Sequence, residues 1–237
     1  MTGGNGYVVI FGTGTYLIAG DRTDTDIQSI YGIWDRLGSD KIVKSKLVKQ
    51  EYSNACETEV VDGVSTTTCG RVLSDNAVTL YESTDGEVTP SVLGWYNDLD
   101  VAASGDIAAA PGERAIRNFQ VRGGIGFVNS VIPTTSNACS ASAGGFGLAF
   151  CPLTGGSGCI GEAVFDINND GDFDANDSIN NRLVFATIFE DSAPTDAAFV
   201  GQNRVTQLTD RSLDIVKTNT ETSINTGRLS WRRLNID

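Results

Sequence analysis

The sequence predicts an all-β protein made of many short strands, and three observations support this prediction. Among the 237 residues, 27 are glycine and one is methionine. The 30 acidic residues divide into 21 aspartates and 9 glutamates, and aspartate and glycine favour turns whereas glutamate and methionine favour helices. Short apolar runs alternate with turns that contain glycine or aspartate, and no long amphipathic helix pattern interrupts them.

The first predicted strand is the apolar and aromatic run at residues 7–11, which the Gly-Thr-Gly sequence of residues 12–14 closes. Its lack of polar side chains predicts a buried strand. A second strand is predicted at residues 29–35, after a polar connection at residues 20–26. Residues 43–50 place three lysines around apolar side chains, which predicts a solvent-facing strand that is protected from edge-to-edge pairing.

A β-hairpin is predicted between Cys56 and Cys69, because Asp62-Gly63 lies between them and is a strong tight-turn signal. A disulfide across this hairpin would close a loop of about 14 residues. Such a loop contributes about 3 kcal/mol to stability in the chain-entropy model.

Further strands are predicted at residues 93–96, 115–121, 125–132, 182–189, 199–208 and 227–234, with a strand–turn–strand unit at residues 144–166. The total is about a dozen strands, and their spacing suits sheets of three or four strands. Such sheets occur in propeller blades and in sandwiches, and no clean short repeat selects between the two. Because no low-complexity linker divides the chain, residues 1–237 are expected to form one domain.

Charge and histidine content exclude several classes of function. Lysine plus arginine is 17 and aspartate plus glutamate is 30, so the net charge is −13, and there is no histidine. The chain therefore lacks the basic surface of a nucleic-acid-binding protein and a polybasic membrane patch, and it has no apolar run near the ~20 residues of a membrane span. Without histidine, Ser-His-Asp and Cys-His nucleophiles and histidine-ligated zinc or haem are excluded. We expect a protein that is not an enzyme.

The chain has five cysteines, at positions 56, 69, 139, 151 and 159. No Cys-x-x-Cys pair and no histidine are present to form a zinc site. The spacing favours two disulfides and one remaining thiol, and therefore an oxidising compartment; five reduced, buried cysteines are the alternative. No signal peptide follows Met1, so we expect either an excised fragment or an export signal upstream.

The strongest candidate for a functional site in the sequence is one acidic loop, residues 166–177. Oxygen-bearing side chains occupy positions 1, 3, 5, 9 and 12, glycine occupies position 6, and position 8 is apolar, which is the spacing of a calcium loop. The predicted ligands are Asp166, Asn168, Asp170, the backbone carbonyl of Asp172, Asp174 (directly or through water) and Asp177. Five carboxylates within twelve residues repel one another unless a cation lies among them, and oxygen ligands favour Ca²⁺ over zinc or copper. The alternative is a solvated aspartate-asparagine turn.

Other candidate sites are weaker. Asp21, Asp24 and Asp26 have the composition of a second cation site but lack a central glycine, which favours a solvated loop. Residues 97–100 are predicted to form an exposed turn. The three tryptophans, at positions 34, 95 and 231, are predicted to belong to the core rather than to a ligand platform.

Several of these segments, taken in order, resemble the C-terminal β-propeller of the PilY/PilC family, the type IV pilus assembly and tip-associated adhesins. The matching segments are residues 6–17 (GYVVIFGTGTYL), 28–35 (QSIYGIWD), 112–114 (GER), 122–124 (RGG), Ile132-Pro133 ahead of Cys139, the acidic loop, and 227–232 (GRLSWR). The resemblance extends over nearly the whole chain, and the ordered set is more specific than any single segment.

The resemblance implies a partial or modified β-propeller of short antiparallel sheets with an EF-hand-like calcium loop, in which residues 1–237 form the later blades of a longer protein. It also implies that Ca²⁺ regulates pilus extension and retraction, and hence twitching motility, and supports attachment to surfaces. The implied partners are minor pilins at the pilus tip and a host or abiotic surface. The implied location is extracellular, at an outer-membrane-associated pilus tip.

Phe150 and Cys151 stand where the family tends to have tryptophan and acidic residues. A local disulfide between Cys151 and Cys159 is therefore the first choice, with Cys139 as an alternative partner. Other propellers that use calcium include quinone-dependent dehydrogenases, so a secreted propeller of that kind, or a structural calcium module unrelated to pili, is the alternative function.

Overall fold

A computed structural model describes residues 6–36, 41–80, 82–84, 87–89, 92–133, 144–159, 161–190 and 192–220. Within these ranges the chain forms sixteen β-strands and three short 3₁₀ helices, and it contains no α-helix. The prediction of an all-β protein is therefore confirmed. The strands form four separate sheets of four, seven, three and two strands, none of which closes into a barrel.

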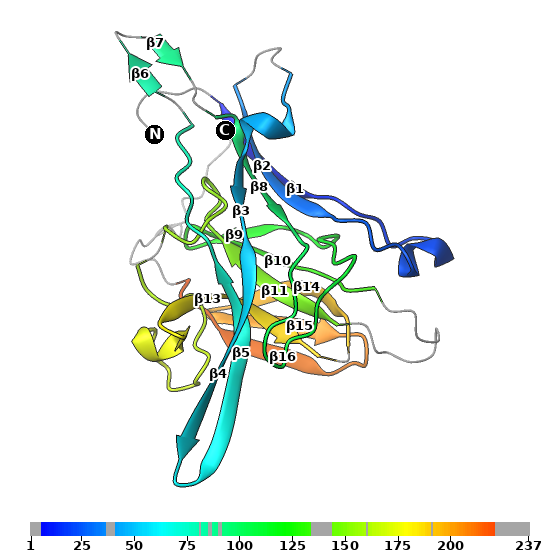
Figure 1. The fold of residues 1–237 in the computed structure, drawn as a ribbon, viewed down its shortest axis with the longest axis vertical. Coiled ribbons are helices and arrows are strands. Elements are labelled where there is room, and N and C mark those ends of the chain that lie inside the picture. Colours follow the sequence, from blue (N-terminus) through cyan, green and yellow to red (C-terminus); the bar gives the residue numbers. More distant parts are fainter. Residues whose placement is uncertain are drawn as a thin grey trace, which may run out of the picture.

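The four-stranded sheet has the order β1-β2-β8-β3 (Figure 1). Its strands are β1 (Tyr7–Gly12), β2 (Ser29–Asp35), β8 (Gly94–Asp98) and β3 (Val48–Gln50). Neighbouring strands are antiparallel except for β3 and β8, which are parallel. One face carries the buried side chains of Ile30 and Trp95, and β1 lies at one edge of the sheet. The prediction that residues 7–11 are buried is wrong, because β1 alternates between half-buried and exposed side chains.

The hairpin of β4 (Tyr52–Val61) and β5 (Val64–Leu73) projects from the body of the protein (Figure 1). Asp62 and Gly63 form its turn with φ values of 52° and 79°, which aspartate and glycine tolerate better than most residues. Cys56 and Cys69 are directly opposite in the ladder and form the predicted disulfide. The sequence signals for this hairpin are local, and each of them is confirmed.

The hairpin continues into the seven-stranded sheet, whose order is β4-β5-β13-β11-β10-β9, with β12 paired to β13 at the side. The added strands are β13 (Arg182–Phe189), β11 (Gly145–Phe150), β10 (Ile125–Asn129), β9 (Gln120–Arg122) and β12 (Ser178–Ile179). All side chains of β10 and β11 are buried. Phe146, Leu148 and Phe185 therefore form the centre of the hydrophobic core.

The three-stranded sheet consists of β14 (Pro194–Val200), β15 (Asn203–Leu208) and β16 (Leu213–Lys217). It packs on the larger sheet through Phe199, whose ring centroid lies 5.1 Å from that of Phe127. The two-stranded sheet is formed by β6 (Glu82–Thr84) and β7 (Glu87–Thr89).

The second disulfide joins Cys151 to Cys159, as predicted. The loop that it closes packs on the side chain of Trp95, whose indole N–H donates to the carbonyl of Pro152 over 3.1 Å. This contact joins the four-stranded sheet to the end of β11. Trp34 and Trp95 both belong to the buried set, as expected. Cys139, Trp231 and the predicted strand at residues 227–234 lie outside the described residues.

Several predicted elements are corrected. Residues 43–50 form the 3₁₀ helix η2 (Lys44–Lys46) followed by β3, rather than one strand. Of the strand predicted at residues 115–121, only the last two residues belong to a strand, β9, which continues to Arg122. The strand predicted to end near residue 166 is an isolated bridge between Phe165 and Thr218. Residues 199–208, predicted as one strand, are divided at Gly201 between β14 and β15. Residues 97–100 do not form an exposed turn, because Asn97 and Leu99 are both only 1% exposed.

Among the described residues, no helix is long and apolar enough to span a membrane.

Candidate metal centre

The acidic loop lies between two strand-like segments of the core. Phe165 pairs with Thr218, the residue that follows β16, and the amide of Asp166 donates to the carbonyl of Lys217 over 3.1 Å. At its other end the 3₁₀ helix η3 (Ala175–Asp177) leads directly into β12. Both ends of the loop are therefore fixed by the sheets.

Two buried carboxylates hold the loop closed. Asp166 Oδ2 accepts the amide of Gly171 over 3.0 Å. Asp177 Oδ1 accepts the amide of Ile167 over 2.7 Å, and its Oδ2 accepts the amide of Asp174 over 3.2 Å. The φ of Gly171 is 96°, a value that glycine adopts without a steric penalty. These contacts explain why the loop has acidic residues at its first and last positions and glycine at the bend.

One oxygen in this arrangement has no hydrogen-bond partner among the described residues. Asp166 is 4% exposed and its Oδ1 is both buried and unpaired. Asp177 is fully buried, and this burial raises the pKa of its carboxyl. The hydrogen bond from the amide of Ile167 acts in the opposite direction, and the nearby charge of Asp166 adds to the increase. An unpaired carboxylate oxygen beside a second buried carboxylate is costly unless a cation compensates it.

The middle of the loop is more exposed and folds on itself. Asn168 Nδ2 donates to Asp170 Oδ2 over 2.9 Å, and the amide of Asp170 returns a hydrogen bond to Asn168 Oδ1 over 3.0 Å. The amide of Asp172 donates to Asp170 Oδ1 over 2.9 Å, and Asp174 Oδ1 caps η3 by accepting the amide of Asn176 over 2.7 Å. The predicted ligands are thus all in one loop, but several of them bind each other.

Lys217 is a contact that the sequence did not predict. Its ammonium group donates to the carbonyl of Gly171 and lies 5.3 Å from the ring centroid of Phe173. Phe173, the apolar residue at position 8 of the loop, is half-buried and lies against this lysine, whereas Ile167 is the loop residue that packs against the core. No local pattern links residues 171 and 217, because their proximity results from the pairing of β16.

Across the described part of the chain, no three or more carboxylate or thiol side chains converge closely enough to hold a metal ion as they stand. Asp166, Asn168, Asp170, Asp174 and Asp177 are nevertheless all oxygen donors of the kind that Ca²⁺ prefers. The unpaired oxygen of Asp166 is the observation that fits a bound cation. Ligation would require Asn168 and Asp170 to exchange their mutual hydrogen bond for the ion.

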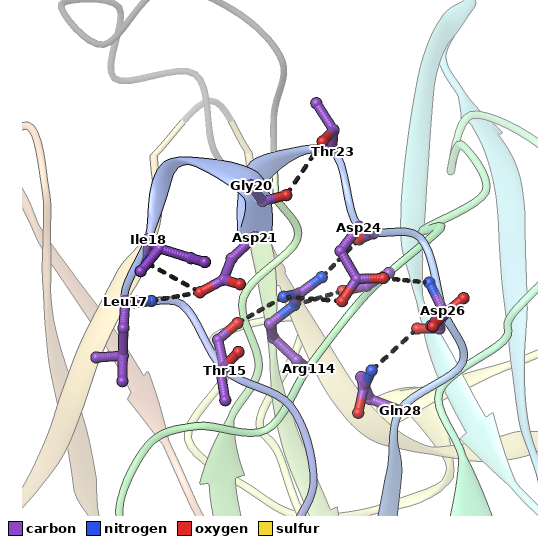
Figure 2. Close-up of polar contacts among 11 residues, drawn as sticks. Thr15, Leu17, Ile18, Gly20, Asp21, Thr23, Asp24, Asp26, Gln28 and Arg114 are labelled. Atoms are coloured by element: carbon purple, nitrogen blue, oxygen red, sulfur yellow. Dashed lines mark hydrogen bonds and ion pairs between the residues drawn. The ribbon is translucent and has the colours of Figure 1, made fainter.

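The second candidate cluster is compensated by a side chain of the protein (Figure 2). Most residues of this loop are exposed, as a solvated loop requires, but the side chain of Asp21 is buried and accepts the amides of Leu17 and Ile18. The guanidinium of Arg114 lies 4.0 Å from Asp24. Asp26 is exposed, and its amide donates to Asp24 Oδ1 over 2.9 Å. Arg114 therefore supplies positive charge beside Asp24.

A buried ion pair inside the core was also missed. Arg71 and Glu113 are both fully buried and are 2.8 Å apart at their closest atoms. Glu113 Oε1 also accepts the hydroxyl of Ser130 over 2.5 Å. Both side chains are fully buried, and their ion pair joins β5 to the segment before β9.

Comparison with known proteins identifies relatives of one kind. A type IV pilus biogenesis factor PilY1 homolog of Xylella fastidiosa is 30% identical over 227 residues, which is 95% of this chain and 16% of that protein. The type IV pilus biogenesis factor PilY1 of Pseudomonas aeruginosa is 29% identical over 179 residues, which is 72% of this chain and 14% of the relative. A second Xylella fastidiosa PilY1 homolog is 27% identical over 157 residues, or 66% of this chain and 9% of that protein. The chain thus spans about a sixth or less of these relatives. No protein-family model and no solved structure matches it.

Proposed function

This chain belongs to the PilY1 family, and we propose that it is a calcium-binding β-propeller module that acts in type IV pilus biogenesis at the cell surface. The relatives are named as pilus biogenesis factors and not as enzymes, which supports a binding and regulatory role. The chain spans 16% of the Xylella fastidiosa relative, and we propose that it forms part of a larger propeller, as the later blades that the resemblance implies.

The observation that supports calcium binding best is the unpaired, buried Oδ1 of Asp166. It lies at the first position of a loop whose oxygen donors follow the calcium-loop spacing. In the bound state Asp166, Asn168, Asp170, the carbonyl of Asp172, Asp174 and Asp177 would hold the ion. Bound Ca²⁺ would supply a compensating positive charge and would order the loop.

An acidic loop ordered by calcium would also affect the sheets to which its two ends are attached. One end of the loop pairs with the residues that follow β16, and the other end leads into β12 beside β13. Calcium would therefore stabilise the contact between the three-stranded and seven-stranded sheets. We propose that this coupling regulates pilus extension against retraction and supports attachment, with minor pilins at the pilus tip, or a host or abiotic surface, as partners.

The direct test is isothermal titration of calcium into chelator-treated protein. Asp170→Ala removes a central ligand, and we expect it to reduce or abolish binding at a single saturable site. Asp106→Asn is the matched control, because Asp106 is exposed and lies outside the loop. An unchanged titration in the Asp170 variant would overturn the assignment of the loop.

A further inference from the structure

Arg204, on β15, is a charged side chain buried where the three-stranded sheet packs on the seven-stranded sheet. It is 1% exposed, and its Nη1 donates to the carbonyl of Gly147 on β11 over 3.3 Å. A Cβ at position 147 would overlap Nη2 of Arg204, so glycine at this position leaves the space that the guanidinium occupies. Because removing a guanidinium from water is costly, this position requires interactions that offset the cost.

Hydrogen bonds offset only a small part of this cost. Nε and Nη2 of Arg204 have no hydrogen-bond partner among the described residues. Asp214 lies on the neighbouring strand β16, on the same face as Arg204, but its buried Oδ2 is also unpaired. Burial raises the pKa of Asp214, and the charge of Arg204 opposes that increase. The two side chains therefore interact through their charges.

Two buried aromatic rings contact the guanidinium. Its Cζ lies 5.3 Å from the ring centroid of Phe189 and 5.6 Å from that of Phe165. The two phenylalanines are 3% and 0% exposed. A cation within about 6 Å of an aromatic centroid is attracted to the ring, and the attraction is stronger where water is excluded. Arg204 therefore holds both rings in place between the sheets.

Phe165 connects this contact to the acidic loop. It directly precedes Asp166, the first predicted calcium ligand. Its ring centroid lies 6.2 Å from that of Phe127 on β10, so the ring is held between the seven-stranded sheet and Arg204. Its backbone pairs with Thr218. The ring and the backbone of Phe165 together fix the point from which the side chain of Asp166 extends.

The position of Asp166 decides whether its carboxylate can bind an ion. Its Oδ2 accepts the amide of Gly171 over 3.0 Å, whereas its buried Oδ1 is unpaired. Calcium binds oxygen ligands at about 2.3–2.6 Å, so a displaced carboxylate would bind it more weakly. Side chains that only orient the ligands of a metal typically change its affinity by about 10–100-fold.

We propose that Arg204 is a positioning residue for the acidic loop: its guanidinium holds Phe165, and through Phe165 it fixes the carboxylate of Asp166 in the orientation that binds Ca²⁺. This inference rests on the proposed function for the identity of the ion. The hold on the loop does not itself require calcium, because every contact from Arg204 to Asp166 is made by residues of this chain.

The first measurement is amide hydrogen exchange of the whole chain in chelator, which reports on the loop without calcium. Arg204→Met removes the charge but keeps a long side chain, and we expect the amide of Gly171, which donates to Asp166, to exchange faster. The matched control is Phe189→Leu, which removes the other ring beside Arg204 and leaves Phe165 in contact with it. Thermal unfolding of each variant shows whether the fold is retained.

The second measurement is isothermal titration of calcium into the same proteins. We expect Arg204→Met to bind calcium about 10-fold more weakly than the wild type, and Phe189→Leu to bind it as the wild type does. Arg204→Lys returns a positive charge on a side chain about as long as methionine, and we expect it to recover part of the loss. If Arg204→Met does not fold, Arg204→Lys is compared with Phe189→Leu instead, with a smaller loss expected.

Equally fast exchange of Gly171 in the Arg204 and Phe189 variants would overturn the proposal and leave the proposed function intact. Equal calcium affinities of Arg204→Lys and Arg204→Met would also overturn it, because the charge beside Phe165 would then have no effect on the loop. If the wild type takes up no calcium, the proposed calcium site fails, and the exchange of Gly171 in chelator still decides whether Arg204 positions the loop.

Discussion

The loop that joins β1 to β2 (residues 15–28, the tip loop) and the acidic loop are both turns rich in aspartate. They differ in how the negative charge of their carboxylates is compensated. In the tip loop the carboxylate of Asp24 lies 4.0 Å from the buried guanidinium of Arg114. In the acidic loop the nearby ammonium of Lys217 binds the carbonyl of Gly171, and Asp166 keeps an unpaired oxygen. The tip loop therefore has a cation beside its carboxylates, whereas in the acidic loop the proposed calcium ion would compensate the unpaired oxygen of Asp166.

The largest effect is expected from removing the internal cation. Arg114→Met leaves the carbonyls of Thr15, Asp24 and Gly112 without their donors, and we expect it to lower the free energy of unfolding by about 3 kcal/mol. Because no ion replaces arginine there, the loss should be the same with calcium and with chelator. Urea unfolding under both conditions measures it, and rescue by calcium would show that the tip loop also binds an ion.

The next effect is the calcium dependence of the wild type. At a calcium concentration 100 times the dissociation constant, binding to the folded state contributes about 2.7 kcal/mol. For a chain of this size we therefore expect Tm to rise by roughly 5–10 °C. The rise should vanish in Asp166→Ala and persist in Arg114→Met, as a calorimetric scan of each variant will show. The reverse pattern would contradict the distinction between the two loops.

A smaller effect is expected from Lys217→Met. This change removes the donor to the carbonyl of Gly171 and the contact with Phe173. In chelator we expect it to lower the free energy of unfolding by about 1 kcal/mol. Denaturant unfolding in chelator measures this loss, with Lys41→Met, an exposed lysine outside both loops, as the control. Equal stability of the two variants would mean that Lys217 does not hold the acidic loop.

The smallest effect concerns acid pH and the tip loop. The amides of Ile18 and Leu17 hold the pKa of Asp21 below its ordinary value of 3.8. A carboxyl with a lowered pKa in the folded state stabilises the fold above the pKa of the unfolded chain, and this contribution is lost as pH falls through the folded value. The stability difference between wild type and Asp21→Asn should therefore shrink as pH falls below 3.8. Unfolding measured on both sides of that pH tests it, and a difference that grows in acid would contradict the role of Asp21.

Features encoded by neighbouring residues could be predicted from the sequence. The turn at Asp62-Gly63, the Cys56–Cys69 and Cys151–Cys159 disulfides and the position of the acidic loop all depend on residues close in the chain. Features that depend on distant pairing could not. Residues 7–11 look buried because they are apolar, but β1 lies at a sheet edge, and edge position leaves no trace in a local pattern.

The same limit explains what was missed at the two loops. Arg114 contacts residues about ninety positions away, and Lys217 reaches the acidic loop through the pairing of β16. The sequence therefore identified the carboxylates of both loops but not the cations beside them.

The most direct test of the calcium site is a crystal structure of the protein grown in calcium. The account predicts an ion about 2.3–2.6 Å from Asp166 Oδ1, with further oxygen ligands from the acidic loop at similar distances. Asn168 and Asp170 should no longer be hydrogen-bonded to each other. A structure at saturating calcium in which Asp166 Oδ1 binds only water, and the Asn168–Asp170 hydrogen bonds remain, would contradict the account.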